Sequence, residues 1–246
     1  MARDELSIWL NHFEHHAAHP RCVPQGLPDA LSEHERRLIA GSIATFQLGE
    51  QSEGGTLMRA ARRFAAAHEL PALERIMELF IREEQRHAQL LGAFMSDHGL
   101  PAKRSDWTDR VFRCVRRLAG LELYLHVFIC AELIGIVYYR ALAAATGCLR
   151  LRVLCRTLVA DELAHVGFES QLLLGLRARQ GLLMRTAARL AHRMLLVAAA
   201  GVVWLTHRAV LRQGGHDARS FLRACRAQYA FYLEPVAVSA AQALPR

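Results

Sequence analysis

Apolar residues recur every three or four positions through most of this 246-residue chain. Such spacing is typical of amphipathic helices that bury one face. No segment shows the alternation of apolar and polar residues between hairpin turns that indicates β-strands. The pattern therefore predicts an all-α protein.

Helix start and stop signals divide this pattern into segments. Ser32-x-x-Glu35 forms a capping box, Pro71 suits the first turn of a helix, and residues 99–101 (Gly-Leu-Pro) form a stop signal. A kink is expected at the Gly54-Gly55 pair. The predicted helices cover residues 1–19, 32–64, 71–99, a stretch from between Trp107 and Arg113 to about 145, and then 149–179, 182–212 and 218–233.

Four glutamates and two histidines interrupt the apolar runs in a repeated pattern. They are Glu50, Glu84, His87, Glu132, Glu162 and His165. Each half of the pattern is a helix with a single carboxylate, followed by a helix with Glu-x-x-His. Residues three apart share a helix face, so each Glu-x-x-His pair presents an oxygen and a nitrogen together. Four such helices packed inward make the carboxylate-rich cage of a di-metal protein.

The surroundings of these residues favour a metal site over a set of surface charges. Glu is rarely buried without a partner, and Glu132 lies within the apolar run 127–137. Burying several unpaired carboxylates would cost several kcal/mol each, whereas two divalent cations would balance four of them. The alternative, surface glutamates and satisfied core histidines, does not explain the duplication.

At these residues the chain resembles the ferritin-like di-iron carboxylate superfamily, over about residues 32–180. Residues 83–87 (Glu-Glu-Gln-Arg-His) are similar to the signature of soluble acyl-carrier-protein desaturases and bacterial multicomponent monooxygenases. The resemblance implies terminal ligands at Glu50 and Glu132, bridging ligands at Glu84 and Glu162, and one histidine for each metal. It also implies acids that hydrogen-bond the ligand histidines, and it suggests a further carboxylate one turn beyond the first ligand. These additional residues are Glu83, Asp161 and Glu53.

The resemblance implies a ferritin-like four-helix bundle of up-down-down-up topology. If the two Glu-x-x-His helices run antiparallel, the second and third helices must run parallel, and residues 99–113 would supply the crossover. We expect one domain, with an N-terminal extension at 1–31, the bundle at 32–180, and one or two extra helices at 181–246 packed on it.

Several positions differ from known branches of the superfamily. About 65 residues follow the fourth bundle helix, more than in ferritin storage shells. Leu91 stands where a radical-storing reductase subunit would have tyrosine, and Leu158 stands where arylamine N-oxygenases have an extra histidine. No Cys-x-x-Cys rubredoxin module is present. These differences leave a di-iron oxidase or oxygenase as the expected class, and its subfamily stays open.

The expected activity is O₂-dependent oxidation of a small aliphatic or aromatic substrate, free or bound to an acidic carrier protein. Hydroxylation, desaturation and N-oxygenation all remain open. The expected cofactors are two iron ions, with Mn/Fe and Mn/Mn as alternatives, O₂ as co-substrate and an external electron donor. Tyr139 is singled out among the inward-facing positions, the others being Phe46, Gln47, Gly54, Leu91, Phe128, Ile136 and Phe168. Two alternative functions are an iron-oxidising or peroxide-detoxifying protein and a metal-stabilised helical binding module.

Net charge and cysteine spacing say less about function than the Glu and His pattern does. The net charge is +8, almost all from arginine because Lys103 is the only lysine, and it favours an acidic partner. No compact basic run is present, so we expect no nucleic-acid partner. Six cysteines without Cys-x-x-Cys spacing indicate reduced core thiols in a cytoplasmic protein.

Two remaining segments give weaker predictions. His12, His15, His16 and His19 are interpreted as a solvated polar face rather than a metal site. The apolar run from Met194 to Thr206 has 13 residues, fewer than the roughly 20 of a membrane span. We therefore expect a buried helix without membrane contact, in a monomer or a homodimer.

Overall fold

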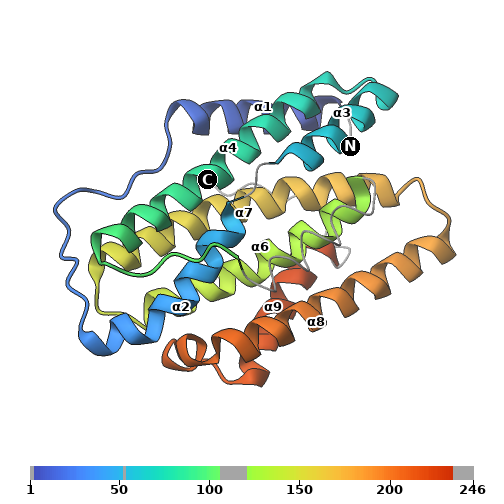
Figure 1. Ribbon diagram of the computed structural model, residues 1–246. Coiled ribbons are helices and arrows are strands. Elements are labelled where there is room, and N and C mark those ends of the chain that lie inside the picture. Colours follow the sequence, from blue (N-terminus) through green and yellow to red (C-terminus); the bar gives the residue numbers. More distant parts are fainter. Residues whose placement is uncertain (1–2, 52–53, 106–120, 235–246) are drawn as a thin grey trace.

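The computed structural model describes residues 3–51, 54–105 and 121–234, and these ranges contain helices but no strand. The all-α prediction is confirmed. The long helices α4, α6, α7 and α8 run along the length of the molecule (Figure 1). The helices are α1 (Arg3–Ala18), α2 (Glu33–Glu50), α3 (Gly55–His68), α4 (Pro71–Asp97), α6 (Leu121–Ala144), α7 (Leu149–Arg177), α8 (Leu182–Gln213) and α9 (Ala218–Leu233). The expected crossover lies partly within 106–120, and the predicted start of its following helix lies wholly there, outside the described residues.

The capping box at the start of α2 forms as predicted and also ties this helix to a distant turn. Ser32 Oγ accepts from the backbone N–H of Glu35, and the Glu35 carboxylate accepts from the backbone N–H of Ser32. The same carboxylate accepts from Thr146 and Gly147 in the α6–α7 connection. The Ser32 hydroxyl, then the backbone N–H of Gly147, lower the pKa of Glu35 to about 2.

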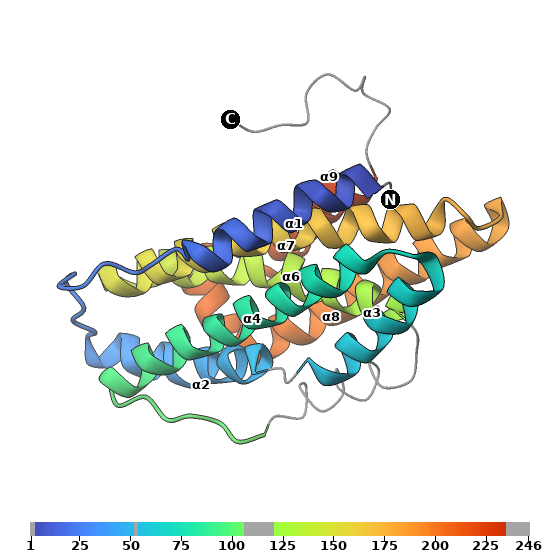
Figure 2. The ribbon, with the colours of Figure 1, turned by 90° about the horizontal axis from the view of Figure 1, so that it is seen from above.

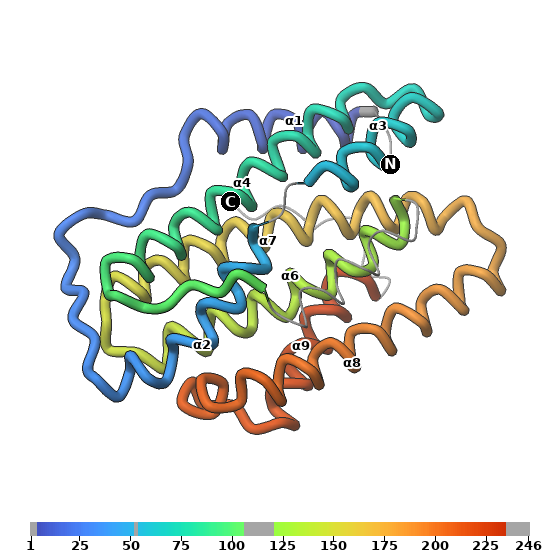
Figure 3. The backbone as a smooth tube through the Cα atoms, viewed as in Figure 1, coloured from blue at the N-terminus to red at the C-terminus, as the bar shows by residue number. Residues whose placement is uncertain are grey.

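The predicted kink at Gly54 is a complete break between α2 and α3. Gly54 has a φ of 65°, and a Cβ at this position would lie 2.6 Å from Ile81 of α4. Only glycine combines this left-handed backbone with so close an approach. Figure 3 traces the chain from α2 through α3 into α4, and the break leaves Glu50 at the end of α2.

The centre of the molecule is α6, which packs against α7, α8 and α9. Both α6 and α8 are long and apolar enough to cross a membrane, judged by length and composition alone. The most apolar 18 residues of α6 are 83% buried, as expected for a core helix, whereas those of α8 are only 33% buried. The prediction that the run from Met194 to Thr206 is buried is therefore wrong for the single chain, because α8 covers the core with one face only.

The N-terminal helix α1 packs along α4 and reaches α7 (Figure 2). Trp9 donates its indole N–H to Gln171 of α7 across 2.8 Å. Phe13 is fully buried, with its ring 6.1 Å from that of His165 and 5.6 Å from that of Phe168. The N-terminal extension thus closes one side of the motif helices.

Candidate metal centre

Four helices bring the six motif residues together in the interior. Glu50 comes from the last position of α2, Glu84 and His87 from α4, Glu132 from α6, and Glu162 and His165 from α7. The last five are buried, and Glu50 is partly buried. They form two groups, in each of which one ligand atom per residue lies within 4.8 Å of all the others. The groups are Glu50, Glu84, His87 and Glu162, and Glu84, Glu132, Glu162 and His165.

Two carboxylates belong to both groups. Glu84 and Glu162 are shared, whereas Glu50 and Glu132 each belong to one group. Each group also contains one histidine. This is the arrangement that two adjacent cations require, with two carboxylates between them and one carboxylate and one imidazole at either end.

Both histidines turn the same ring nitrogen toward the shared carboxylates. His87 Nδ1 lies 3.2 Å from Glu162 Oε1 and 3.5 Å from Glu84 Oε1. His165 Nδ1 lies 3.0 Å from Glu162 Oε2 and 3.1 Å from Glu84 Oε1. Two Nδ1 atoms and four carboxylates therefore converge on one buried volume.

The opposite ring nitrogens meet the acids that precede the motif glutamates. His87 Nε2 lies 3.0 Å from Asp161 Oδ2, and His165 Nε2 lies 3.2 Å from Glu83 Oε2. The pairing is crosswise, since α4 supplies the acid for the α7 histidine and α7 supplies the acid for the α4 histidine. With Nε2–H donating to a carboxylate, each neutral imidazole would turn its Nδ1 lone pair toward a cation bound among the glutamates.

Orphaned polar atoms show that the site fits cations. Glu84 Oε1 and His87 Nδ1 are buried and make no well-aligned hydrogen bond, although other ligand atoms of the site lie 3.1 to 3.2 Å away. Burial, then the charges of Glu84 and Glu162, raises the pKa of Glu50 and of Glu132 well above the ordinary range. A cation bound between these atoms would satisfy the orphans and allow all four carboxylates to ionise.

A network of basic residues surrounds the outer acids. Asp161 accepts from Arg86 across 2.5 Å and from Arg21, and Glu83 lies 3.0 Å from His16 Nδ1. His16, Glu83 and Asp161 also meet the geometric criterion for a metal group. However, the two arginines already neutralise the carboxylate of Asp161, so we interpret this group as an ion-pair network.

The prediction of a solvated histidine face on α1 is wrong for His16. The residue is 9% exposed, and the ring of His12 stacks on the His16 ring at a centroid distance of 4.8 Å. The spacing of histidines one turn apart marked the face, but nothing in the sequence indicated that α1 would fold over α4. His15 and His19 are exposed, as expected.

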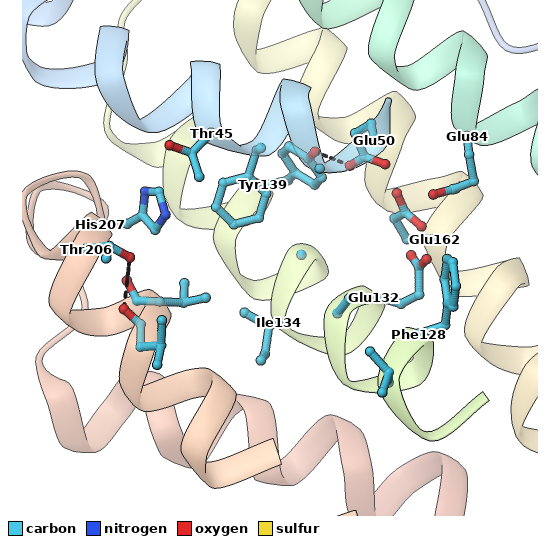
Figure 4. A pocket seen from close by; sticks show the side chains of 17 residues that line it. Thr45, Glu50, Glu84, Phe128, Glu132, Ile134, Tyr139, Glu162, Thr206 and His207 are labelled. Carbon is cyan, nitrogen blue, oxygen red and sulfur yellow. Dashed lines mark hydrogen bonds between the residues drawn. The ribbon is translucent and has the colours of Figure 1, made fainter. Parts of the chain in front are cut away.

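Tyr139 connects the site to a cavity. Its hydroxyl donates to Glu50 Oε1 across 2.5 Å, and its ring is fully buried on α6, seven residues beyond Glu132. Figure 4 shows this hydrogen bond beside Glu84 and Glu162. Burial, then the charge of Glu50, raises the pKa of Tyr139 well above its usual value, so the phenol keeps its proton.

The cavity has a volume of about 150 Å³ and extends from the glutamates to α8 (Figure 4). Its wall is mostly apolar between the two ends. The lining residues are Thr45, Phe46, Gly49, Glu50, Glu84, Val127, Phe128, Ala131, Glu132, Ile134, Gly135, Tyr139, Glu162, Val202, Val203, Thr206 and His207. Of the inward-facing positions expected from the sequence, Phe46, Phe128 and Tyr139 line it. Gln47, Gly54, Leu91, Ile136 and Phe168 do not.

One further site residue was not predicted from the sequence. Glu169 lies one turn beyond His165 on α7, is 1% exposed, and has no hydrogen-bond partner for Oε2. Its seven-residue spacing from Glu162 could have marked it as a further inward carboxylate. Glu53, the acid suggested by the resemblance, lies outside the described residues. Among the described cysteines, Cys22 is exposed rather than in the core, and the other four are buried free thiols.

No family model, curated protein or solved structure matches this chain. The function of the site therefore has to follow from its own geometry and chemistry. Buried clusters of Glu and His that could hold metal ions are present in an all-helical protein.

Proposed function

We propose that this protein is an O₂-activating non-haem di-iron oxidoreductase of ferritin-like fold that oxidises a small apolar organic substrate. The observation that carries the proposal is the pair of four-residue groups sharing Glu84 and Glu162, which open onto an apolar cavity. The four-helix bundle assignment belongs to the same proposal. It rests on the convergence of α2, α4, α6 and α7 on one di-metal cage.

The donor set narrows the choice of metal. Carboxylates and imidazoles suit iron and manganese, whereas structural zinc sites most often use thiolates and a closed tetrahedral shell. None of the described cysteines belongs to either group. Bound iron would supply the electrons and the open coordination positions that O₂ reduction needs.

The protein's own residues prepare this chemistry. Asp161 and Glu83 hold the two imidazole N–H groups and orient both Nδ1 lone pairs toward the shared carboxylates. The Tyr139 hydroxyl holds Glu50 by a hydrogen bond and keeps a proton beside the cavity. Ion pairs of Arg21 and Arg86 fix Asp161 from the outside.

The cavity supports an organic substrate rather than iron as the species oxidised. Its wall between the glutamates and α8 includes Val127, Phe128 and Ile134, which offer no ligand for a transiting cation. Polar groups gather at its outer end, where Thr45, Thr206 and His207 also line a second cavity of about 390 Å³. A small molecule with an apolar body could reach the glutamates along this path.

The proposal is tested by loading the protein anaerobically with Fe²⁺ and mixing it with O₂. We expect two iron ions per chain, consumption of O₂ by the bound iron, and a transient optical absorbance that decays faster with the right apolar substrate. Glu132→Gln is the matched variant, because it removes one carboxylate from a single group while keeping the shape of the side chain. Assembly into a hollow shell that deposits iron oxide on repeated Fe²⁺ addition would instead establish the iron-oxidising alternative.

A further inference from the structure

The outer face of α8 carries a long exposed apolar stripe. Its members follow one another at intervals of three or four residues, so they share one side of the helix. They are Leu183, Ala187, Leu190, Met194, Val197, Gly201 and Leu205. Leu183 is 85% exposed, Met194 is 65% exposed and Leu205 is 69% exposed. At about 1.5 Å per residue, the stripe extends roughly 33 Å.

The opposite face of α8 is fixed in the protein. Leu196, Ala200 and Leu211 are buried against the core, and α8 packs on α2, α6 and α9. Because one face is held in this way, α8 cannot cross a bilayer as an independent span without leaving the fold. A helix held like this can only lie against a surface with its exposed side.

Basic residues dominate the charge of α8 and α9, and the acid that follows α9, Glu234, pairs with Arg193 across 2.5 Å. The sequence of α8 contains five arginines and no Asp or Glu, and α9 contains three arginines and no Asp or Glu. Arg208 and Arg212 are exposed and follow the stripe at its C-terminal end. Between the two helices, Asp217 caps α9 by accepting from the backbone N–H of Ser220.

We propose that the outer face of α8 docks on an anionic lipid surface, with the helix lying in the plane of the interface. Apolar side chains would enter the acyl boundary, and arginines would meet lipid phosphates. A second copy of the chain fits less well, because pairing α8 with itself would bring together two helices rich in arginine, in which Arg193 is paired with Glu234 but Arg208 and Arg212 stay exposed. This proposal differs from the sequence-based expectation of no membrane contact.

Docking by this face gives the cavity a source of substrate. Val202, Val203 and Thr206 of α8 line the cavity that leads to Glu50 and Glu84. An apolar molecule dissolved in the membrane would thus have a short path to the glutamates. This consequence, a membrane-dissolved apolar substrate, rests on the proposed function, whereas docking itself does not.

The test is co-sedimentation of the full-length protein with vesicles of phosphatidylcholine, with and without phosphatidylglycerol. We expect strong binding only when the anionic lipid is present, weakened by salt. Leu190→Glu with Met194→Glu should weaken binding by at least about tenfold, because both side chains would have to leave the acyl boundary. Ile8→Glu on α1, which replaces another exposed apolar residue, is the matched control and should bind as wild type does.

Charge is tested separately with Arg208→Gln combined with Arg212→Gln. At roughly fivefold for each arginine near an anionic surface, binding to the anionic vesicles should fall roughly 25-fold. Circular dichroism and metal content should stay unchanged in every variant, since all altered positions are exposed. If both double variants bind the anionic vesicles as tightly as the wild-type protein does, the proposal is overturned. So would a lipid-free dimer in sedimentation equilibrium that the Leu190/Met194 variant dissociates, because the face would then belong to a second copy.

Discussion

The imidazole of His87 on α4 donates from Nε2 to Oδ2 of Asp161 on α7 across 3.0 Å, although the two residues are 74 positions apart. Both side chains are fully buried. This hydrogen bond keeps the Nε2 proton of His87 on the Asp161 side, so the neutral ring that would bind a cation has its lone pair on Nδ1, and it links the two Glu-x-x-His helices directly. Asp161 is in turn held by Arg21 and Arg86, so the orientation of the histidine depends on α4, on α7 and on the loop after α1.

Replacing this acid should weaken metal binding. Asp161→Asn keeps the shape but loses the charge that stabilises the Nε2–H tautomer, and we expect an affinity for Fe²⁺ or Mn²⁺ that is about 10- to 100-fold lower. Competition with a coloured chelator measures the change. Asp97→Asn is the control, because Asp97 lies at the end of α4 and pairs there with Arg150 rather than with a histidine of the site. Equal affinities for the two variants would contradict the role of Asp161.

The shared carboxylates should matter more than the unshared ones. Glu84→Ala or Glu162→Ala removes a ligand from both groups, so we expect the metal pair to be lost. Glu132→Ala removes a ligand from one group only and should leave about one ion per chain bound. Elemental analysis of the purified variants gives the answer. Retention of two ions by Glu84→Ala would show that Glu84 does not lie between the metals.

The stability of the metal-free protein should depend on pH through Glu50 and Glu132. Burial and the neighbouring Glu84 and Glu162 raise both pKa values well above the ordinary value of about 4.3. The folded state therefore binds more protons than the unfolded chain above about pH 4.3, and the free energy of unfolding falls as pH rises through the raised pKa values.

In the metal-free protein, His87 and His165 also lower the free energy of unfolding as pH rises. Burial lowers their pKa values, but Glu162 and the other nearby carboxylates outweigh it and raise them well above about 6.5. Their contribution to the free energy of unfolding is fully present below about pH 6.5 and is lost as pH rises through the pKa values of the folded state. We therefore expect chelator-treated protein to melt at a lower temperature at about pH 8 than at about pH 6.5, whereas protein loaded with redox-inert Zn²⁺ should not. Parallel pH profiles with and without metal would contradict this.

Tyr139 should affect the reaction without affecting metal content. Tyr139→Phe removes the hydroxyl that bonds to Glu50, so the decay of the absorbance that follows O₂ mixing should change, while two ions remain bound. The matched control is Tyr138→Phe. Tyr138 is equally buried on the same helix, but its hydroxyl bonds to Ser42 and it does not line the cavity. If the two variants give the same kinetics, Tyr139 has no special role.

Periodic signals predicted much of this structure. The repeated Glu and Glu-x-x-His pattern anticipated which six residues meet, because inward-facing positions on packed helices are set by local spacing. Predicted helix ends that carry clear start or stop signals also lie close to the observed ends, and α9 spans the predicted 218–233.

Features that depend on long-range packing were not predictable in this way. The burial of His16 requires α1 to lie along α4, and the exposure of α8 depends on how many neighbours cover it. Glu169 was overlooked because a carboxylate one turn beyond a motif is common on solvated faces. Periodicity defines the apolar side of a helix but not which neighbour covers that side.

The most direct test of the metal centre is X-ray diffraction from crystals of the iron-loaded protein, measured on both sides of the iron absorption edge. Two anomalous peaks are expected between α2, α4, α6 and α7, both in contact with Glu84 and Glu162, with His87 on one and His165 on the other. A single peak, no peak, or a peak among His16, Glu83 and Asp161 would contradict the di-metal account.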